Sequence, residues 1–378
     1  MNKQVASGSV VIAGGGVIGL ACALECRLRG AKVTLVEKGR CGGQASGAAA
    51  GMLAPYSENS EYPDPFYKLC QDSLALYEEW LQLIGEYSNT DPEYRQTGSL
   101  NVVFHGADVE PMKRRINWQQ ATGIRAEWVE ENDLRRLEPA LASDVKGAIL
   151  YPDEAHLYAP AYVTALEEAC RMAGVDILDH AGEIVLQKKD GEFLLTGGSL
   201  PHPVSGDRLV IATGAWAEEW QEACGAIWPV VPIRGQICAF PIVAGEVRHM
   251  VFGSQGYVVA KANGSLVCGA SEDVAGFDTS VTEAGIARLE RWSRQLIPNL
   301  DGRPILLKWA GLRPATRDGW PLIGPVRGAE QVICAFGHYR NGILLAPVTA
   351  KRIGDWLEGR AIPGYMEAFD PMRFTIYD

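Results

Sequence analysis

The stretch Val10-Val11-Ile12-Ala13-Gly14-Gly15-Gly16-Val17-Ile18-Gly19 is a short β-branched run that breaks into glycines and then into a helical pattern. Gly14, Gly16 and Gly19 have the G-x-G-x-x-G spacing. The first glycine permits a sharp turn, the second lets the backbone approach a pyrophosphate, and the third lets a helix pack closely on a strand. The phosphates would lie at the positive N-terminus of that helix. The stretch therefore predicts a bound dinucleotide.

The sequence that follows supports this prediction. Apolar residues at helical spacing predict a helix over 17–28, which Gly30 ends. Residues 33–36 predict a second strand, directly followed by Glu37. This acid lies 18 residues after Gly19, near the place where dinucleotide-binding folds use a carboxylate to bind ribose hydroxyls. An ordinary βαβ unit with a glycine turn is the alternative interpretation.

Composition restricts the class of protein. The 378 residues are 47% hydrophobic and 21% charged, as expected of a globular chain with two domains. The net charge of −11 argues against nucleic acid as a partner, because a nucleic-acid interface needs a basic face. The nine cysteines include no C-x-x-C pair, so neither a metal site nor a disulfide framework is predicted.

Hydropathy gives no reason to expect a membrane protein. No stretch reaches the roughly 20 uninterrupted apolar residues of a membrane span. Residues 10–24 are apolar enough to suggest a signal-peptide core, but no substantial basic segment precedes them and charged residues follow at once. We therefore expect a soluble, cytoplasmic protein without a targeting segment.

The expected elements divide the chain into two discontinuous domains. A Rossmann-like domain is assigned to residues 1–56, 142–226 and 311–378, where helices and strands alternate. A second, β-rich domain is assigned to residues 57–141 and 227–310. The expected helices beyond the first are 66–87, 109–122, 130–136, 158–173, 282–296 and 343–357. The expected later strands are 98–104, 175–178, 208–213, 233–240, 256–260, 265–269 and 332–336, with a hairpin of 183–186 and 193–195 around Asp190-Gly191.

Residues 41–52 are almost all small and include neither a charged residue nor a proline. A solvated loop would contain more of both. We expect this segment to lie inside the protein against something flat and bulky, such as a cofactor ring. Tight packing between domains is the alternative.

Only one G-x-G-x-x-G unit is present, which favours a flavin reduced directly by its substrate. A nicotinamide-dependent dehydrogenase also has one unit and stays open as an alternative. Residues 337–344 run from an expected strand into a helix N-terminus. Such an end, aimed at a flavin, would stabilise the negative charge of the reduced ring. A simple phosphate or solvent cap is the alternative.

Two arginines have unusual neighbours for surface residues. Arg313 lies in Trp309-Ala-Gly-Leu-Arg-Pro314, and Arg340 lies in the glycine-flanked loop 337–342. A planar guanidinium can hold a carboxylate by two parallel hydrogen bonds. A structural ion pair is the alternative for each. Tyr257, at the start of an expected strand, offers a hydroxyl donor or is merely packed.

No catalytic triad emerges, because the serines lack a nucleophile-elbow pattern and the six histidines are dispersed. Hydride removal from a neutral amine needs orientation rather than a protein base.

The motifs together resemble the FAD-dependent D-amino-acid oxidase (DAO) superfamily, and within it the glycine oxidases of the thiamin-biosynthesis type. The stretches that carry the resemblance are 14–19, Glu37, 46–52, 309–314 with Asp318-Gly319, and 337–344. The resemblance implies an α/β and α+β fold: a Rossmann-like FAD-binding domain of the GR2/DAO type with an antiparallel-sheet substrate domain.

The resemblance also implies the site residues. Arg313 would hold the substrate carboxylate, Tyr257 would hydrogen-bond it, and Arg340 would line the substrate pocket near the flavin. The residues expected to bind FAD are Gly14, Gly15, Gly16, Val17, Ile18, Gly19, Glu37, Lys38, Ala45, Ser46, Ala50, Gly51, Met52, Ile184, His338, Tyr339, Arg340, Asn341, Gly342, Ile343 and Leu344.

By the same resemblance, glycine, sarcosine or D-alanine would transfer a hydride to flavin N5, and O2 would be reduced to hydrogen peroxide. The imine would feed the thiazole of thiamin or hydrolyse to glyoxylate and ammonia, and the protein would be a homotetramer. No cysteine near 309–340 except Cys334 is placed to tether the flavin, so we expect non-covalent FAD.

Gln255 and Glu272 depart from the family pattern, and Glu272 is a candidate for altering the amine preference. One rival is a D-amino-acid or imino-acid dehydrogenase that uses an acceptor other than oxygen. A second is a non-catalytic flavin-binding protein.

Overall fold

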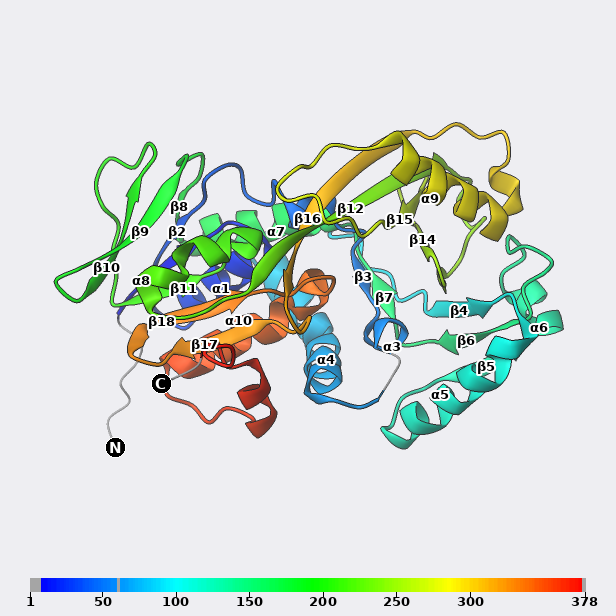
Figure 1. The fold of residues 1–378 in the computed structure, drawn as a ribbon, viewed down its shortest axis with the longest axis horizontal. Helices are drawn as coiled ribbons and strands as arrows, with labels where there is room; N and C mark the ends of the chain where they lie inside the picture. Colours follow the sequence, from blue (N-terminus) through cyan, green and yellow to red (C-terminus); the bar gives the residue numbers. More distant parts are fainter. Residues whose placement is uncertain (1–7, 60–61, 376–378) are drawn as a thin grey trace.

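The computed structural model describes residues 8–59 and 62–375, which build two large sheets. A six-stranded sheet has the order β17-β18-β11-β1-β2-β8, and an eight-stranded sheet has the order β16-β12-β15-β14-β13-β4-β6-β5. In Figure 1 the first sheet lies in the left part of the molecule and the second in the right part. The long strands β12 and β16, which belong to the second sheet, lie in the middle, beside the first sheet.

The six-stranded sheet is the predicted Rossmann-like unit. Its first strand, β1, pairs in parallel with β2 on one side and with β11 on the other, so the chain returns to this sheet as predicted. Only β17 runs antiparallel, to β18. Its strands are β1 (Ser9–Ala13), β2 (Lys32–Val36), β8 (Asp176–Leu178), β11 (Arg208–Ile211), β17 (Leu322–Val326) and β18 (Ala329–Phe336). The helices around it are α1 (Val17–Leu28), α4 (Pro65–Gly85), α7 (Ala159–Ala173) and α10 (Gly342–Leu357).

The eight-stranded sheet is the predicted antiparallel sheet, with one parallel pair, β13 with β4. Its strands are β4 (Ser99–Val103), β5 (Glu127–Glu130), β6 (Gly147–Tyr151), β12 (Val230–Pro241), β13 (Met250–Gly253), β14 (Gly256–Ala260), β15 (Ser265–Gly269) and β16 (Leu307–Thr316). The helices beside it are α5 (Val109–Ala121), α6 (Glu131–Leu137) and α9 (Glu283–Leu296). The fold class expected from the sequence is therefore confirmed.

Short elements connect these parts. The predicted hairpin is present as β9 with β10, and both of its turn residues, Asp190 and Gly191, have positive φ. The short elements are α2 (Ala45–Ala48), β3 (Met52–Leu53), α3 (Pro55–Glu58), η1 (Gly106–Asp108), β7 (Ala155–His156), β9 (Ile184–Lys189), β10 (Glu192–Gly197), η2 (Gly214–Trp220), α8 (Gln221–Cys224), η3 (Pro298–Leu300) and η4 (Gly364–Phe369).

Seven of the strands in the described residues were not expected from the sequence: β3, β5, β6, β7, β13, β16 and β17. Two of them, β6 and β16, lie in the eight-stranded sheet although their residues fall largely in the segments assigned to the FAD domain. The division of the chain into the two sets of segments stays a prediction.

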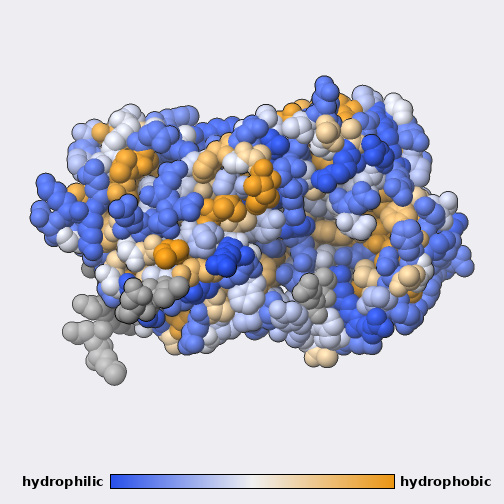
Figure 2. All heavy atoms as spheres, in the orientation of Figure 1, coloured by the Kyte–Doolittle hydropathy of each residue, from blue (hydrophilic) through white to orange (hydrophobic). Residues whose placement is uncertain are grey.

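The surface and the cysteines show nothing unusual for a globular chain. The face in Figure 2 is mostly hydrophilic, with apolar patches among charged side chains. No helix within the described residues is long and apolar enough to cross a membrane. All nine cysteines are free, and eight of them are buried while Cys41 is half-buried. Across residues 8–59 and 62–375, no group of His, Cys, Asp and Glu side chains is arranged to hold a metal ion.

Helix α10 contains a proline, and a side chain of α4 bonds to the carbonyl that the proline leaves without a partner. Pro347 has no N–H, so the Ile343 carbonyl loses its partner within the helix. The Tyr77 hydroxyl of α4 donates a hydrogen bond to that carbonyl. The Ser73 hydroxyl, one turn earlier, donates to the Leu344 carbonyl over 2.6 Å. Helix α4 thereby anchors the first turn of α10, which the sequence places beside the flavin.

We expect Tyr77→Phe to lower the free energy of unfolding by about 1–3 kcal/mol, because it leaves a buried carbonyl without a donor. Tyr87→Phe is the matched control, since Tyr87 also packs against this core and no hydrogen bond of its hydroxyl is found within the described chain. Urea unfolding measures both variants. Equal, small effects would contradict the anchoring role of Tyr77.

Candidate functional site

A large pocket of about 1880 Å³ lies between the two sheets. This volume exceeds the roughly 300–1,000 Å³ of a drug-sized ligand site and leaves room for a dinucleotide and a small substrate. The wall includes most of the residues predicted from the sequence: Gly14, Gly16, Val17, Ile18, Glu37, Lys38, Ala45, Ser46, Ala50, Gly51, Met52, Ile184, Tyr257, Arg313, His338, Tyr339, Arg340, Asn341, Gly342 and Ile343. Gly15, Gly19 and Leu344 do not line the pocket.

The three fingerprint glycines have different local roles. Gly14 has φ +105°, and a Cβ there would lie 2.5 Å from the Ala212 carbonyl oxygen. A Cβ at Gly19 would lie 1.8 Å from the Gly14 oxygen. At Gly16, by contrast, a Cβ would meet only the Ser46 hydroxyl, at 3.2 Å. Gly14 and Gly19 therefore serve the packing of the chain itself, while Gly16 borders the pocket, where a phosphate could approach.

The Glu37 carboxylate is fixed at the end of β2. Its Oε2 accepts from the Gly15 N–H over 2.7 Å, and its Oε1 accepts from the Gly39 N–H over 2.8 Å. A carboxylate oxygen accepts more than one hydrogen bond. Glu37 is thus held in place and can still accept from ribose hydroxyls.

Two further residues in this part of the pocket were not singled out from the sequence. The Thr213 hydroxyl is buried and has no partner among the described residues, and Thr213 lies beside Gly14 on the pocket wall. The Lys38 ammonium lies 3.7 Å from the centre of the Trp216 ring, which also lines the pocket. The run Ala212-Thr213-Gly214 was recognised only as a strand end. A glycine turn, a fixed acid and an orphaned hydroxyl together fit a dinucleotide such as FAD.

Two glycines, one on β12 and one on β16, form part of the pocket wall. Gly235 and Gly311 lie opposite each other in this ladder. A Cβ at Gly311 would lie 2.7 Å from the Ala48 Cβ, so α2 rests on this point. Trp309 of β16 also donates from its indole N–H to the Ala48 carbonyl over 2.9 Å. The small residues around α2 therefore line the pocket and pack between the two sheets, while Gly43 and Gln44 are exposed, so the expectation that all of 41–52 lies inside the protein is wrong at these two residues.

The Arg313 guanidinium lies across Gly235, where a Cβ would be 2.5 Å from it. Its Nη1 donates to the Ser271 carbonyl over 2.9 Å. In the described chain, no carboxylate oxygen lies within the 4.0 Å of an ion pair with Arg313. The structural ion pair considered as an alternative is therefore not found for Arg313. Its charge is available to a ligand in the pocket.

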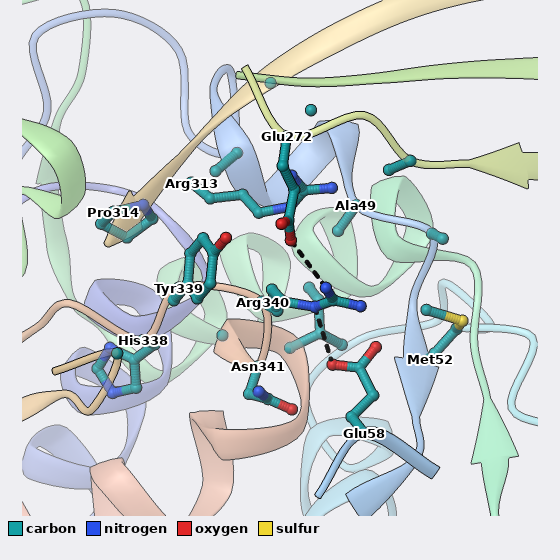
Figure 3. Close-up of a pocket in the computed structure, with 18 of the residues that line it drawn as sticks. Ala49, Met52, Glu58, Glu272, Arg313, Pro314, His338, Tyr339, Arg340 and Asn341 are labelled. Carbon is teal, nitrogen blue, oxygen red and sulfur yellow. Dashed lines mark hydrogen bonds and ion pairs between the residues drawn. The ribbon is translucent and has the colours of Figure 1, made fainter. Parts of the chain in front are cut away.

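Arg340 differs, because two carboxylates already hold it. Its Nη1 lies 2.8 Å from Glu272 Oε1 and its Nε lies 3.4 Å from Glu58 Oε2. Figure 3 shows Arg340 between these two acids, with Arg313 close to Glu272. Glu58, and then Glu272, raise the pKa of the Arg340 guanidinium, which stays charged. The ion pair left open as an alternative is thus present for Arg340. Glu58 could not be found from the sequence, since it lies in a four-residue helix without a distinctive pattern.

Tyr257 is buried on the wall, with 6% of its surface exposed. Burial raises the pKa of its hydroxyl to about 12, so it remains a proton donor at any ordinary pH. The charged groups acting on it are Arg313, Glu58 and Arg340. No hydrogen bond of this hydroxyl is found within the described residues, so Tyr257 and Arg313 both offer unused donors.

The loop 337–342 is held by its own backbone. The Tyr339 N–H donates to the Pro314 carbonyl over 3.1 Å, next to Arg313. In α10 the Leu345 N–H bonds to the Asn341 carbonyl over 2.8 Å, so the N–H groups of the preceding turn are not used within the helix. His338 bonds through Nε2 to the Thr349 hydroxyl over 3.0 Å, and burial lowers its pKa to about 3. His338 is therefore neutral and serves to fix the loop.

Comparisons with known proteins agree with this geometry. Residues 9–356 match the family described as "DAO: FAD dependent oxidoreductase". A protein named glycine oxidase from Geobacillus kaustophilus is 30% identical, over 97% of this chain and 96% of that protein. The crystal structure of glycine oxidase from Geobacillus kaustophilus has a TM-score of 0.91 and 29% identity, covering 97% of this chain and 98% of that one. A "Bifunctional protein ThiO/ThiG" from Trichormus variabilis is 34% identical over 97% of this chain, which spans 55% of that protein's length.

Alanine at Gly14 is expected to lower the stability of the protein, whereas alanine at Gly16 is expected to weaken FAD binding. Gly14→Ala combines positive φ with a backbone clash and should lower the free energy of unfolding of the apoprotein by about 2 kcal/mol or more. Gly16→Ala has an ordinary φ of −74° and should fold normally. It should weaken FAD binding about tenfold or more, a loss of about 1.4 kcal/mol.

Thermal unfolding of the apoprotein and titration with FAD separate the two effects. A Gly16→Ala protein that binds FAD as tightly as the wild type would argue against phosphates at this turn.

Proposed function

Because the chain belongs to the DAO family of FAD-dependent oxidoreductases, we propose that it oxidises glycine and other small amines such as sarcosine and D-alanine. The observation that carries this proposal is the Arg313 guanidinium, which faces the pocket without a carboxylate partner in the described chain and beside the Tyr257 hydroxyl. A small amino acid supplies the missing carboxylate. The names of the relatives point to the same substrate.

Arg313 binds the substrate carboxylate through two parallel hydrogen bonds, and the Tyr257 O–H donates a further one. Their positions are set by rigid elements, since Arg313 lies on β16 and Tyr257 on β14. Anchoring the carboxylate at two points restricts the orientation of the substrate, so that its Cα–H bond points in one preferred direction. The contribution of the protein to the rate is therefore mainly orientation.

FAD held by Gly16, Glu37 and the loop 337–342 would supply the acceptor for a hydride from Cα, at flavin N5, with O2 as the final oxidant and hydrogen peroxide as its product. The amine loses this hydride and one N–H proton and becomes an imine. The imine supplies the thiazole of thiamin, or water hydrolyses it to glyoxylate and ammonia. The relative named ThiO/ThiG supports the first fate.

No protein base is required when the amine reaches the site in its neutral form. His338 is a poor proton acceptor, since burial lowers the pKa of its ring to about 3 and its Nε2 is hydrogen-bonded to the Thr349 hydroxyl. We also propose that FAD is bound without a covalent tether, because Cys334 is buried in β18 and does not line the pocket. A homotetramer stays a prediction from the resemblance, and a cytoplasmic location stays a prediction from the hydropathy of the sequence.

One assay separates the proposal from its rivals. The yellow holoprotein is mixed without oxygen with glycine, sarcosine, D-alanine and D-proline, and bleaching of the flavin absorbance is followed. Air is then admitted and peroxide is measured. Bleaching followed by fast peroxide release supports the oxidase. Bleaching with slow peroxide release supports a dehydrogenase that uses another acceptor, and no bleaching by any amine supports a non-catalytic flavin protein.

Arg313→Ala should lower kcat/KM for glycine by at least about 100-fold, because two hydrogen bonds to a charged group are lost. The loss should appear mainly in KM, with the flavin spectrum and FAD affinity unchanged. Arg317→Ala is the control, since Arg317 is exposed and lies outside the pocket wall. Equal damage to substrate and flavin binding would show instead that Arg313 is structural.

A further inference from the structure

We propose that Glu272 selects the charge class of the substrate. By holding Arg340 and adding a negative charge to that wall, it makes the pocket favour amines with one carboxylate and disfavour amines with a second acidic group. This inference rests on the proposed amine-oxidising function and assigns a role to Glu272.

Two arginines act on the Tyr257 hydroxyl, but only one can receive a ligand carboxylate without losing a partner. Arg313 makes one hydrogen bond to a backbone carbonyl, and no acid within the described chain is paired with it. Arg340 is paired with Glu272 at 2.8 Å and with Glu58 at 3.4 Å. A carboxylate of the ligand therefore finds Arg313, while Arg340 is occupied.

The Glu58–Arg340–Glu272 cluster carries one net negative charge, since two carboxylates face one guanidinium. Arg313 stands close to it, as Figure 3 shows. An amino acid with one carboxylate fits this arrangement, because its carboxylate meets Arg313 and it brings no second anion to the cluster. A second carboxylate on the ligand would approach Glu272 and be repelled.

Of the two acids, Glu272 is the one that can be changed without harm to the fold. The Glu58 side chain is 9% exposed, and its Oε2 has no hydrogen bond in the described structure besides its ion pair. The Glu272 side chain is 46% exposed, and such pairs add little to folding. Glu272→Gln keeps the shape of the side chain, removes one charge and weakens the attraction that holds Nη1 of Arg340.

Glu272 also reaches the loop that carries Arg340. Burial, and then the Glu272 carboxylate, raise the pKa of the Tyr339 hydroxyl, which places the acid close to Tyr339. Glu272 follows Ser271, whose carbonyl receives the Arg313 hydrogen bond. One short segment therefore contacts both arginines: the Ser271 carbonyl bonds to Arg313, and the Glu272 carboxylate pairs with Arg340.

The test uses ligands that differ only in the second carboxylate. (Methylthio)acetate has one carboxylate, thiodiacetate has two, and neither has an amine to be oxidised. Their dissociation constants are measured by the change in flavin absorbance of the holoprotein at low salt. Glu272→Gln should improve the affinity for thiodiacetate relative to (methylthio)acetate by about tenfold or more. The control Glu192→Gln removes an exposed charge from β10, away from the pocket, and should leave the ratio within about twofold.

Turnover provides the second measurement. The ratio of kcat/KM for iminodiacetate to that for sarcosine should rise in Glu272→Gln by a factor similar to the binding ratio. Glu272→Ala should give the same direction, which excludes an effect peculiar to the amide. A binding ratio unchanged within about twofold in both variants would overturn the role of Glu272. If no amine reduces the flavin of any variant, the proposed function fails, while the binding ratio still decides the charge selection.

Discussion

The absence of two side chains, at Gly235 and Gly311, is the constraint on which the pocket depends. They face each other in the β12–β16 ladder, and side chains of such a pair point to the same face of a sheet. Because neither residue has a Cβ, two groups can pack closely against that face. These groups are α2, through Ala48, and the guanidinium of Arg313. Helix α2 on the pocket wall and the Arg313 guanidinium are thus both placed by the missing side chains of one ladder.

The local parts of this molecule could be predicted from sequence because their reasons are local. The βαβ unit with Gly14, Gly19 and Glu37 can be recognised from the spacing of these residues within a few tens of positions. The strands that were missed lack such signals. The strand β17 contains Gly324 and Pro325, and Pro314 interrupts the alternation of β16, so neither resembles an isolated strand. Their partners in the folded sheets, not their own sequence, make them strands.

The residues of the candidate site also divide into those that the sequence could reveal and those that only the fold reveals. Arg313 stood out because an arginine between apolar residues and a proline has no reason to be at a surface. Arg340 stood out equally, and nothing in its surroundings along the chain could tell a ligand arginine from a paired one. The difference is made by Glu58, which precedes Arg340 by 282 residues and is brought to it only by the fold. Thr213 was likewise visible only as the end of a strand, since its orphaned hydroxyl is a fact of packing.

The proposed oxidase reaction would release peroxide inside a protein that has nine free cysteines. A thiol is oxidised as its thiolate, and only where the oxidant can reach it. Burial raises the pKa of eight of these thiols, which keeps them protonated. Cys238 is the exception, because its contact with Cys268 lowers its pKa, but it is 0% exposed. Peroxide released by the proposed reaction would therefore find almost no accessible thiolate among these cysteines.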